Sequence, residues 1–172
     1  MMRRILVTGF PGFLAGFLVE ELVPHAERLD LLVEGRFREA AEARAATIGP
    51  KCRVVVGDIT APDLGLEAKA RDEILAEADA VFHLAAVYDL GMTRELGMKV
   101  NVGGTERVND FVRRMKALGG YNYISTCYVS GSYDGYVREG ELLQGITFRN
   151  FYEETKYLAE KSVRTMFGQF PV

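Results

Sequence analysis

Residues 5–16 read Ile-Leu-Val-Thr-Gly-Phe-Pro-Gly-Phe-Leu-Ala-Gly, and this stretch decides the fold. The apolar run at residues 5–7 predicts a buried strand, and the pattern that begins at residue 13 predicts a helix over residues 13–23. Gly9 and Gly12 lie in the tight turn between them, where backbone N–H groups at a helix N-terminus suit a pyrophosphate. The pattern Gly-x-x-Gly-x-x-Ala is close to the dinucleotide-binding fingerprint. Taken alone, however, a glycine-rich turn after a strand is also ordinary structure.

The composition is that of a globular chain with one domain. Its 172 residues can bury a real core, and the net charge of −3, without a basic run, argues against a nucleic-acid partner. Cys52 and Cys127 share no metal or redox spacing, so we expect free thiols in a reducing compartment and no metal site. The chain enters its first strand with no room for a signal peptide, and no apolar run reaches membrane-spanning length. We therefore expect a cytoplasmic protein without membrane contact.

Strand and helix patterns alternate along the whole chain. Strands are predicted at residues 29–33, 53–59, 79–84 and 121–125, and helices at residues 37–47, 67–76, 96–118 and 151–166. This alternation predicts an α/β fold with a doubly wound parallel sheet and helices on both faces. In such a sheet, ligands bind beyond the carboxyl ends of the strands. The glycine-rich turn and several polar or small residues fall at those ends.

The end of the second strand carries opposite signals for a cofactor. An acidic residue there favours NAD, because it bonds the adenosine ribose, whereas a nearby arginine favours the 2′-phosphate of NADP. This chain has Glu34, followed by Arg36 and Arg38. The alternative is that these side chains face water at a helix start.

The third and fourth predicted strands end in further candidates. Asp58 can accept a hydrogen bond from an adenine amino group, or can serve as a turn residue. His83-Leu84-Ala85-Ala86 ends the fourth strand, and its small residues would let a ligand lie against the backbone. His83 is interpreted as a hydrogen-bonded core residue rather than a base.

The candidate chemistry lies near the C-terminal end of the chain. Tyr152 and Lys156 are four residues apart, so they share one face of a helix. A nearby positive charge lowers the pKa of a tyrosine from about 10, and such a tyrosine can pass a proton to a carbonyl oxygen as hydride arrives at carbon. Thr126, after the fifth strand, could hold the same oxygen. Tyr-x-x-x-Lys alone is also a common surface pair, and the glycine-rich turn with Thr126 favours the catalytic interpretation.

With these motifs in order, the chain resembles an extended short-chain dehydrogenase/reductase, which has a Rossmann fold. The resemblance is carried by Thr8-Gly9-x-x-Gly12-Phe13-Leu14, Gly57-Asp58, His83-Leu84-Ala85-Ala86, Ser125-Thr126 and Tyr152-x-x-x-Lys156. Within that family, Gly57-Asp58-Ile59-Thr60, the run Asn101-Val102-Gly103-Gly104-Thr105 and residues 152–160 resemble the male-sterility branch. That branch holds fatty acyl-CoA reductases and thioester reductase domains.

The resemblance implies a role for each matching residue. Tyr152 would be the proton donor, Lys156 would bond the nicotinamide ribose and lower the tyrosine pKa, and Thr126 would hold the substrate carbonyl. In that branch, hydride from a nicotinamide reduces an acyl thioester to a hemithioacetal, which collapses to an aldehyde; another carbonyl compound is the wider possibility. NADP is favoured over NAD, although Glu34 stands where NADP-using relatives often carry arginine. The implied cofactor contacts are Thr8, Gly9, Phe10, Pro11, Gly12, Phe13, Leu14, Glu34, Arg36, Asp58, Ile59, Leu84, Ala85, Ala86, Asn101, Tyr152 and Lys156.

Two other interpretations stay open: a nucleotide-sugar epimerase or dehydratase, which uses the same tyrosine and lysine, and a non-catalytic dinucleotide-binding protein. Family members run past a sixth strand into a substrate-binding portion, and Pro171-Val172 would open that strand. We therefore expect residues 1–172 to be a single NAD(P)-binding domain, an N-terminal fragment truncated before the substrate-binding part. By itself this fragment should keep some dinucleotide affinity and show little or no thioester reduction. Its open sheet edge would then favour self-association.

Overall fold

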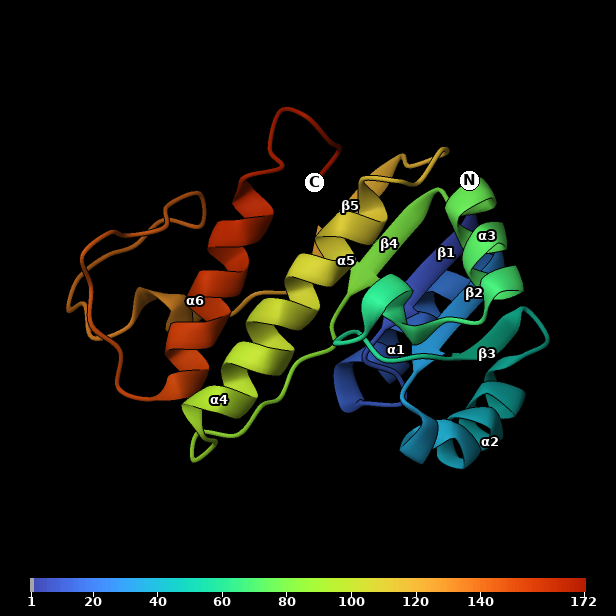
Figure 1. Cartoon of the computed structure of the whole chain (residues 1–172), viewed down its shortest axis with the longest axis horizontal. Helices are drawn as coiled ribbons and strands as arrows, with labels where there is room; N and C mark the ends of the chain where they lie inside the picture. Colours follow the sequence, from blue (N-terminus) through green and yellow to red (C-terminus); the bar gives the residue numbers. More distant parts are fainter. Residues whose placement is uncertain (1) are drawn as a thin grey trace.

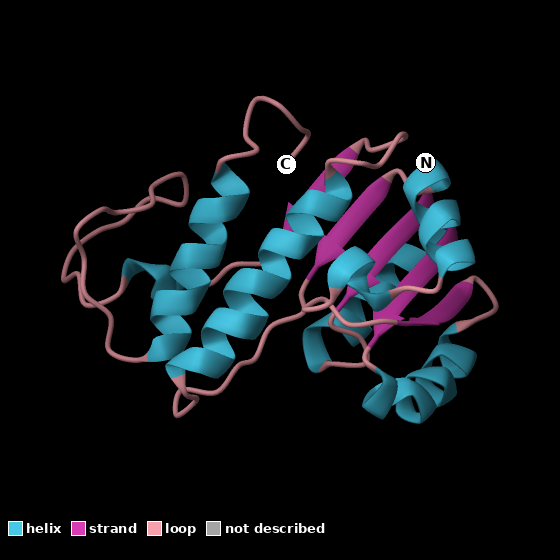
Figure 2. Cartoon of the chain, viewed as in Figure 1, coloured by secondary structure: helices cyan, strands magenta, loops and turns pink. Residues whose placement is uncertain are grey.

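The computed structural model describes residues 2–172, in which five strands form one parallel sheet (Figures 1 and 2). The sheet order is β3-β2-β1-β4-β5, and every neighbouring pair is parallel. The strands are β1 (Met2–Thr8), β2 (Ala26–Val33), β3 (Cys52–Val56), β4 (Ala80–His83) and β5 (Gly120–Tyr123). The order reverses between β1 and β4, so the predicted doubly wound sheet is confirmed, with its switch point beside the glycine-rich turn.

Helices cover both faces of the sheet. Helices α1 (Phe13–Leu22) and α2 (Arg38–Ile48) pack on one face, and α3 (Ala68–Glu77), α5 (Thr105–Val112) and α6 (Phe151–Arg164) supply residues to the core on the other. A short helix α4 (Arg94–Gly97) continues through a π-helical segment (Met98–Gly104) into α5, and α6 lies alongside this composite helix (Figure 1).

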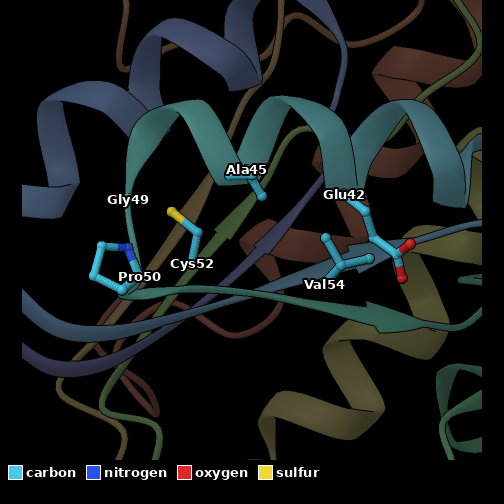
Figure 3. Close-up of a pocket in the computed structure, with 7 residues that line it drawn as sticks. Glu42, Ala45, Gly49, Pro50, Cys52 and Val54 are labelled. Carbon is cyan, nitrogen blue, oxygen red and sulfur yellow. The ribbon is translucent and has the colours of Figure 1, made fainter.

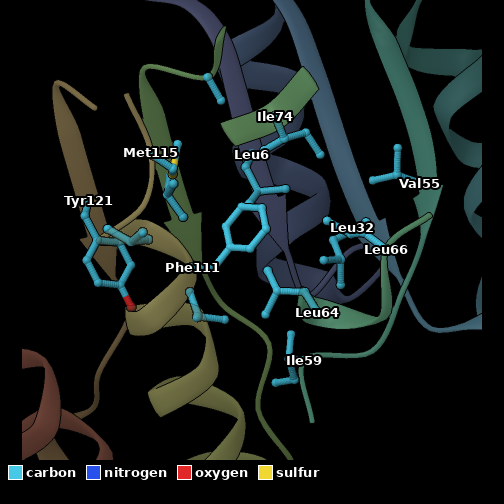
Figure 4. Packing of buried hydrophobic residues seen from close by; sticks show 14 of the residues in the cluster. Leu6, Leu32, Val55, Ile59, Leu64, Leu66, Ile74, Phe111, Met115 and Tyr121 are labelled. Atoms are coloured by element: carbon cyan, nitrogen blue, oxygen red, sulfur yellow. The ribbon is translucent and has the colours of Figure 1, made fainter. Parts of the chain in front are cut away.

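The core follows from the alternation of side chains along strands that are buried on both faces. Ile5 and Val7 pack with α1 and α2, whereas Leu6, between them, points to the opposite face. On that face Leu6 joins Phe111 of α5 and Ile74 of α3 in the larger cluster shown in Figure 4. The strand at the start of the chain is therefore fixed from both sides, and with it the turn that follows.

The predicted helix over residues 96–118 is wrong at its end. Helix α5 stops at Val112, and the backbone N–H of Lys116 donates instead to the carbonyl of Leu75 at 2.9 Å. Gly120 begins β5. One glycine inside the composite helix, Gly104, has a packing role, because a Cβ there would lie 2.6 Å from the side chain of Ile59.

The third strand is shorter than predicted, because it ends at Val56 rather than at residue 59. The backbone N–H of Asp58 turns away to bond the carbonyl of Leu64 at 2.8 Å. This bond closes a loop and places the Asp58 side chain at the carboxyl edge of the sheet.

The predicted sixth strand is not formed at Pro171-Val172 in residues 2–172. The carbonyl of Pro171 does lie against the outer edge of β5, where it accepts the N–H of Tyr121 at 2.7 Å. A cavity of about 960 Å³ runs along the same edge, between β5, the loop at residues 135–141 and α6. Self-association through this edge stays a prediction.

Candidate active site

The glycine-rich turn connects β1 to α1 and packs against the residues that follow β4. Gly9 has φ of +94°, which favours glycine, and a Cβ there would lie 2.9 Å from the backbone nitrogen of Ala85. A Cβ at Gly12 would lie 2.7 Å from the carbonyl oxygen of Gly9. Both positions therefore leave no room for a side chain, and the turn lies close against Leu84 and Ala85.

The N-terminus of α1 fits an anionic ligand. Its N-cap is Gly12, no side chain of the described residues caps it, and its first turn contains no acidic residue. Helix α6 differs, because the Asn150 side chain caps it by accepting the N–H of Glu153 at 2.9 Å. The first N–H groups of α1, with exposed Phe13 and Leu14, thus present donors and a positive dipole end to a pyrophosphate.

Thr8 is fully buried, so its side chain is not exposed to a ligand at the N-terminus of α1. Its hydroxyl oxygen accepts the backbone N–H groups of Leu84 at 3.2 Å and Ala85 at 3.1 Å. Thr8 therefore ties the end of β1 to the end of β4, and any influence on a cofactor acts through the turn that it holds.

Arg44 was missed by the sequence analysis. From α2 it donates to the carbonyl of Pro11 at 3.1 Å, and its guanidinium lies 5.7 Å from the centre of the buried Phe10 ring. A Cβ at Gly16 would overlap this guanidinium, so the glycine makes room for it. The guanidinium of Arg44 also pairs with Glu20 at 3.4 Å, so Arg44 supports the glycine-rich turn from behind as a paired charge, and no sequence motif marks it.

The opposing groups after β2 neutralise one another. Arg36 forms an ion pair with Glu34 at 2.9 Å, and its guanidinium lies 4.6 Å from the centre of the Phe37 ring. Arg38 pairs with Glu42 at 2.8 Å. All these groups are at the surface, so both a solvent-facing role and a contact with an adenosine phosphate remain open.

Asp58 is exposed, and one of its carboxylate oxygens accepts the backbone N–H and the hydroxyl of Thr60 at 2.8 and 2.9 Å. The other oxygen carries no hydrogen bond from residues 2–172. Asp58 thus acts as the turn residue and still has an acceptor to offer, so the two interpretations of this residue are compatible.

Asn101 and Ile59 are buried and face protein rather than an opening. The amide of Asn101 accepts the N–H of Val87 at 2.8 Å and donates to the hydroxyl of Thr155 at 3.2 Å. Ile59 packs against Gly104. The geometry gives both residues a positioning role and does not favour the direct cofactor contact expected from the sequence.

Tyr152 and Thr126 meet at the carboxyl end of β5. The Thr126 side chain lies close enough to the phenol of Tyr152 to influence its pKa, and the rings of Tyr88 and Tyr128 lie 4.9 and 6.4 Å from the Tyr152 ring. Burial raises the pKa of Tyr152, while the nearby Thr126 acts in the opposite direction. The expectation that Lys156 lowers this pKa is wrong for this structure, because the lysine is bonded elsewhere. Tyr88 and Tyr128, missed by the sequence analysis, form an aromatic wall beside the phenol.

Lys156 shares the inner face of α6 with Tyr152 but points to β5. Its ammonium donates to the phenol oxygen of Tyr123 and to the carbonyl of Ile124, both at 2.7 Å. Burial lowers the pKa of Lys156 to about 8, and Glu160 on the same helix acts to raise it. An ammonium has three donors, so one N–H is left without a partner among the described residues. That donor is available to a bound ribose.

His83 is a buried, hydrogen-bonded core residue, as interpreted from the sequence. Its two ring nitrogens lie 2.7 Å from the hydroxyl of Thr8 and 3.0 Å from that of Thr105. Burial and the charge of Lys156 lower its pKa to about 3, so the ring is neutral at physiological pH.

A second pocket, of about 430 Å³, lies between α2 and the amino end of β3 (Figure 3). Its lining includes Glu42, Cys52 and Val54 and none of the predicted site residues.

Within residues 2–172, no helix combines the length and the apolar character needed to cross a membrane.

Comparisons with known proteins show the family of this chain. The family model described as "Male sterility protein" matches residues 7–172. The chain is 30% identical to the alcohol-forming fatty acyl-CoA reductase of Simmondsia chinensis, over 83% of this chain and 35% of that protein. It is 27% identical to fatty acyl-CoA reductase 2 of Arabidopsis thaliana, over 88% of this chain and 29% of that one. The chain thus spans about a third of the length of these curated relatives.

Among solved structures, the terminal R domain of the myxalamid PKS-NRPS pathway superposes with a TM-score of 0.82. The two are 31% identical, over 95% of this chain and 45% of that domain. A thiolation-reductase di-domain from an archaeal non-ribosomal peptide synthetase has a TM-score of 0.80 at 21% identity, which shows a shared fold.

Proposed function

This chain belongs to the male sterility protein family, within the extended short-chain dehydrogenases/reductases, and we propose that it takes part in reducing an acyl thioester with a nicotinamide dinucleotide. The observation that carries the proposal is the grouping at one sheet edge of a helix N-terminus that no described side chain caps, a buried lysine with one N–H unpaired among the described residues, and a phenol beside a threonine. The names of the relatives support the substrate class, because they include fatty acyl-CoA reductases.

The residues present fit the cofactor. The N–H groups at the start of α1 would hold the pyrophosphate, the spare N–H of Lys156 would bond the nicotinamide ribose, and the free oxygen of Asp58 would accept from the adenine. When bound, the reduced nicotinamide supplies a hydride to the substrate carbonyl carbon. Arg36 is the residue that would meet a 2′-phosphate, and for that reason we favour NADPH over NADH.

Tyr152 supplies the proton. Because burial raises its pKa, the phenol is protonated at neutral pH and can donate to a carbonyl oxygen on which negative charge develops. Thr126, beside that phenol, would donate to the same oxygen and orient it. The exposed rings of Tyr88 and Tyr128, which lie against the Tyr152 ring, would offer an apolar surface to the acyl group.

The test is an NADPH-oxidation assay of the full-length gene product with a series of acyl-CoA thioesters, in which aldehyde products are captured and identified. We expect NADPH to bind and to be consumed only with a thioester, with release of free CoA. Tight NADPH binding without turnover on any thioester would favour the non-catalytic interpretation, and turnover on a nucleotide sugar would favour the epimerase interpretation.

A further inference from the structure

A chain of buried polar side chains connects the glycine-rich turn to Lys156. Thr8 contacts His83 at 2.7 Å, His83 contacts Thr105 at 3.0 Å, and Thr105 lies close enough to the phenol of Tyr123 to lower its pKa. Tyr123 in turn accepts from the Lys156 ammonium at 2.7 Å. These residues, the polar chain below, come from β1, β4, α5, β5 and α6, so five elements meet along one line of polar side chains.

The direction of each bond follows from the donors at its start. The Thr8 oxygen accepts two backbone N–H groups, from Leu84 and Ala85, which leaves its own proton for Nδ1 of His83. The neutral ring must then carry its proton on Nε2 and donate it to Thr105.

Thr105 is therefore free to donate to the phenol oxygen of Tyr123. This direction agrees with the effect of Thr105 on Tyr123, which is to lower its pKa against the larger effect of burial. The Tyr123 oxygen is thus an acceptor that is oriented from behind and faces the ammonium of Lys156.

The polar chain cannot feed protons to Lys156. It begins at two backbone N–H groups, which have no proton to release, and Thr8, His83 and Thr105 are each no more than 1% exposed. The residues behind Tyr123 also carry no charge, because the His83 ring is neutral. What remains is a fixed acceptor that holds the ammonium at a set place relative to the glycine-rich turn, since Thr8 directly precedes Gly9.

We propose that Tyr123 is a positioning residue for Lys156, and that Thr8, His83 and Thr105 fix the Tyr123 hydroxyl so that the lysine and the glycine-rich turn are held at a set separation. The proposal rests on the proposed function only for the idea that this separation serves a dinucleotide. The positioning itself is a property of the free chain.

The acid–base behaviour of Lys156 reports the contact directly. The charged or titratable groups that face Lys156 are Tyr123 on β5, His83 on β4, and Tyr152 and Glu160 on its own helix. Removing the Tyr123 hydroxyl would leave the buried ammonium with one partner fewer, and a less solvated ammonium loses its proton more easily. The pKa of Lys156 should therefore fall further below about 8.

The experiment is a pH titration of the chain labelled with [ε-13C]lysine, with the Lys156 signal assigned by Lys156→Arg. In Tyr123→Phe the midpoint should fall by about one pH unit. Tyr121→Phe is the matched control, because it removes a buried phenol hydroxyl from the same strand whose partner is Asn109, at 2.8 Å. In the control the midpoint should stay where it is in the parent. NADPH affinity at neutral pH should fall about tenfold in Tyr123→Phe alone.

An unchanged Lys156 midpoint in Tyr123→Phe would overturn the proposal, whatever the cofactor does. A shifted midpoint in a chain that binds no NADPH would keep the positioning role and remove the proposed function. If Tyr123→Phe does not fold, Lys156→Met gives the reciprocal measurement. The [ζ-13C]tyrosine signal of Tyr123 should then shift while that of Tyr121 stays, and a static Tyr123 signal would contradict the proposal.

Discussion

The guanidinium of Arg36 lies 2.9 Å from the carboxylate of Glu34, so the two groups with opposite expected effects on cofactor choice are paired with each other. Both are well exposed, at 68% and 48% of their side-chain surface, so water screens the pair and either partner can exchange it for a ligand. The cofactor preference then depends on how easily a 2′-phosphate displaces Glu34 from Arg36.

Freeing Arg36 should strengthen the binding of NADPH relative to NADH. In Glu34→Gln we expect the affinity for NADPH to rise about threefold, because the competing carboxylate is gone, while Arg36→Ala should weaken NADPH more than NADH. Calorimetric titration with both cofactors measures this, and Glu39→Gln, an exposed carboxylate in the first turn of α2, is the charge-matched control. Equal effects on the two cofactors would show that Arg36 faces solvent.

Closing the glycine-rich turn with a side chain should abolish dinucleotide binding. Gly12→Val would press its Cβ toward the Gly9 carbonyl and cover the N–H groups of α1, and we expect at least about a tenfold loss of affinity with an unchanged circular dichroism spectrum. Gly140→Val adds the same atoms in open space and should bind normally. Retained affinity in the Gly12 variant would place the pyrophosphate elsewhere.

Removing the proton donor should stop chemistry and spare binding. Tyr152→Phe keeps the aromatic contacts with Tyr88 and Tyr128, so NADPH affinity should hold while turnover falls by about 10²- to 10⁴-fold. Tyr157→Phe is the control on the same helix, because its hydroxyl donates to the carbonyl of Leu143 instead. If the two variants reduce substrate equally fast, the proton comes from another group.

The neutral His83 should make the fold sensitive to mild acid. Its pKa is lowered from 6.5 to about 3 in the folded chain, so the unfolded chain binds a proton first as the pH falls through 6.5. The His83 contribution to the free energy of unfolding is therefore complete above pH 6.5 and decreases down to about pH 3; from pH 6.5 to 5 the loss is about 2 kcal/mol. Urea unfolding at several pH values should show that the free energy of unfolding of His83→Gln falls less steeply with decreasing pH than that of the parent. Equal pH dependences in the variant and the parent would mean that the folded chain protonates His83 as readily as the unfolded chain does.

Sequence reasoning found the sheet and the residues at its carboxyl edge for a physical reason. Apolar runs and the glycines that follow them are local signals in the sequence. A parallel sheet brings the carboxyl ends of its strands to one edge, so Gly9, Asp58, Ala85 and Thr126 can be grouped from the sequence alone.

The rest depends on contacts between distant segments. Helix α5 stops early because the Lys116 N–H finds the Leu75 carbonyl, 41 residues away in the chain, and no local propensity encodes that bond. Tyr123 reads as an ordinary strand residue and Arg44 as an ordinary helix residue. Only the fold shows that Tyr123 accepts a hydrogen bond from Lys156 and that Arg44 donates one to the Pro11 carbonyl. Lys156 likewise has the right spacing from Tyr152, but its β5 partners direct its charge away from the phenol.

The most direct test of the central claim is the fate of hydride. The full-length gene product is incubated with an acyl-CoA thioester and NADPH that carries deuterium at the reactive carbon of the nicotinamide, and the captured aldehyde is analysed by mass spectrometry. The account predicts that the deuterium is found on the former carbonyl carbon of the product, and that Tyr152→Phe forms far less of it. An unlabelled product, or none at all from a full-length protein that binds NADPH tightly, would contradict the assignment of thioester reduction to this site.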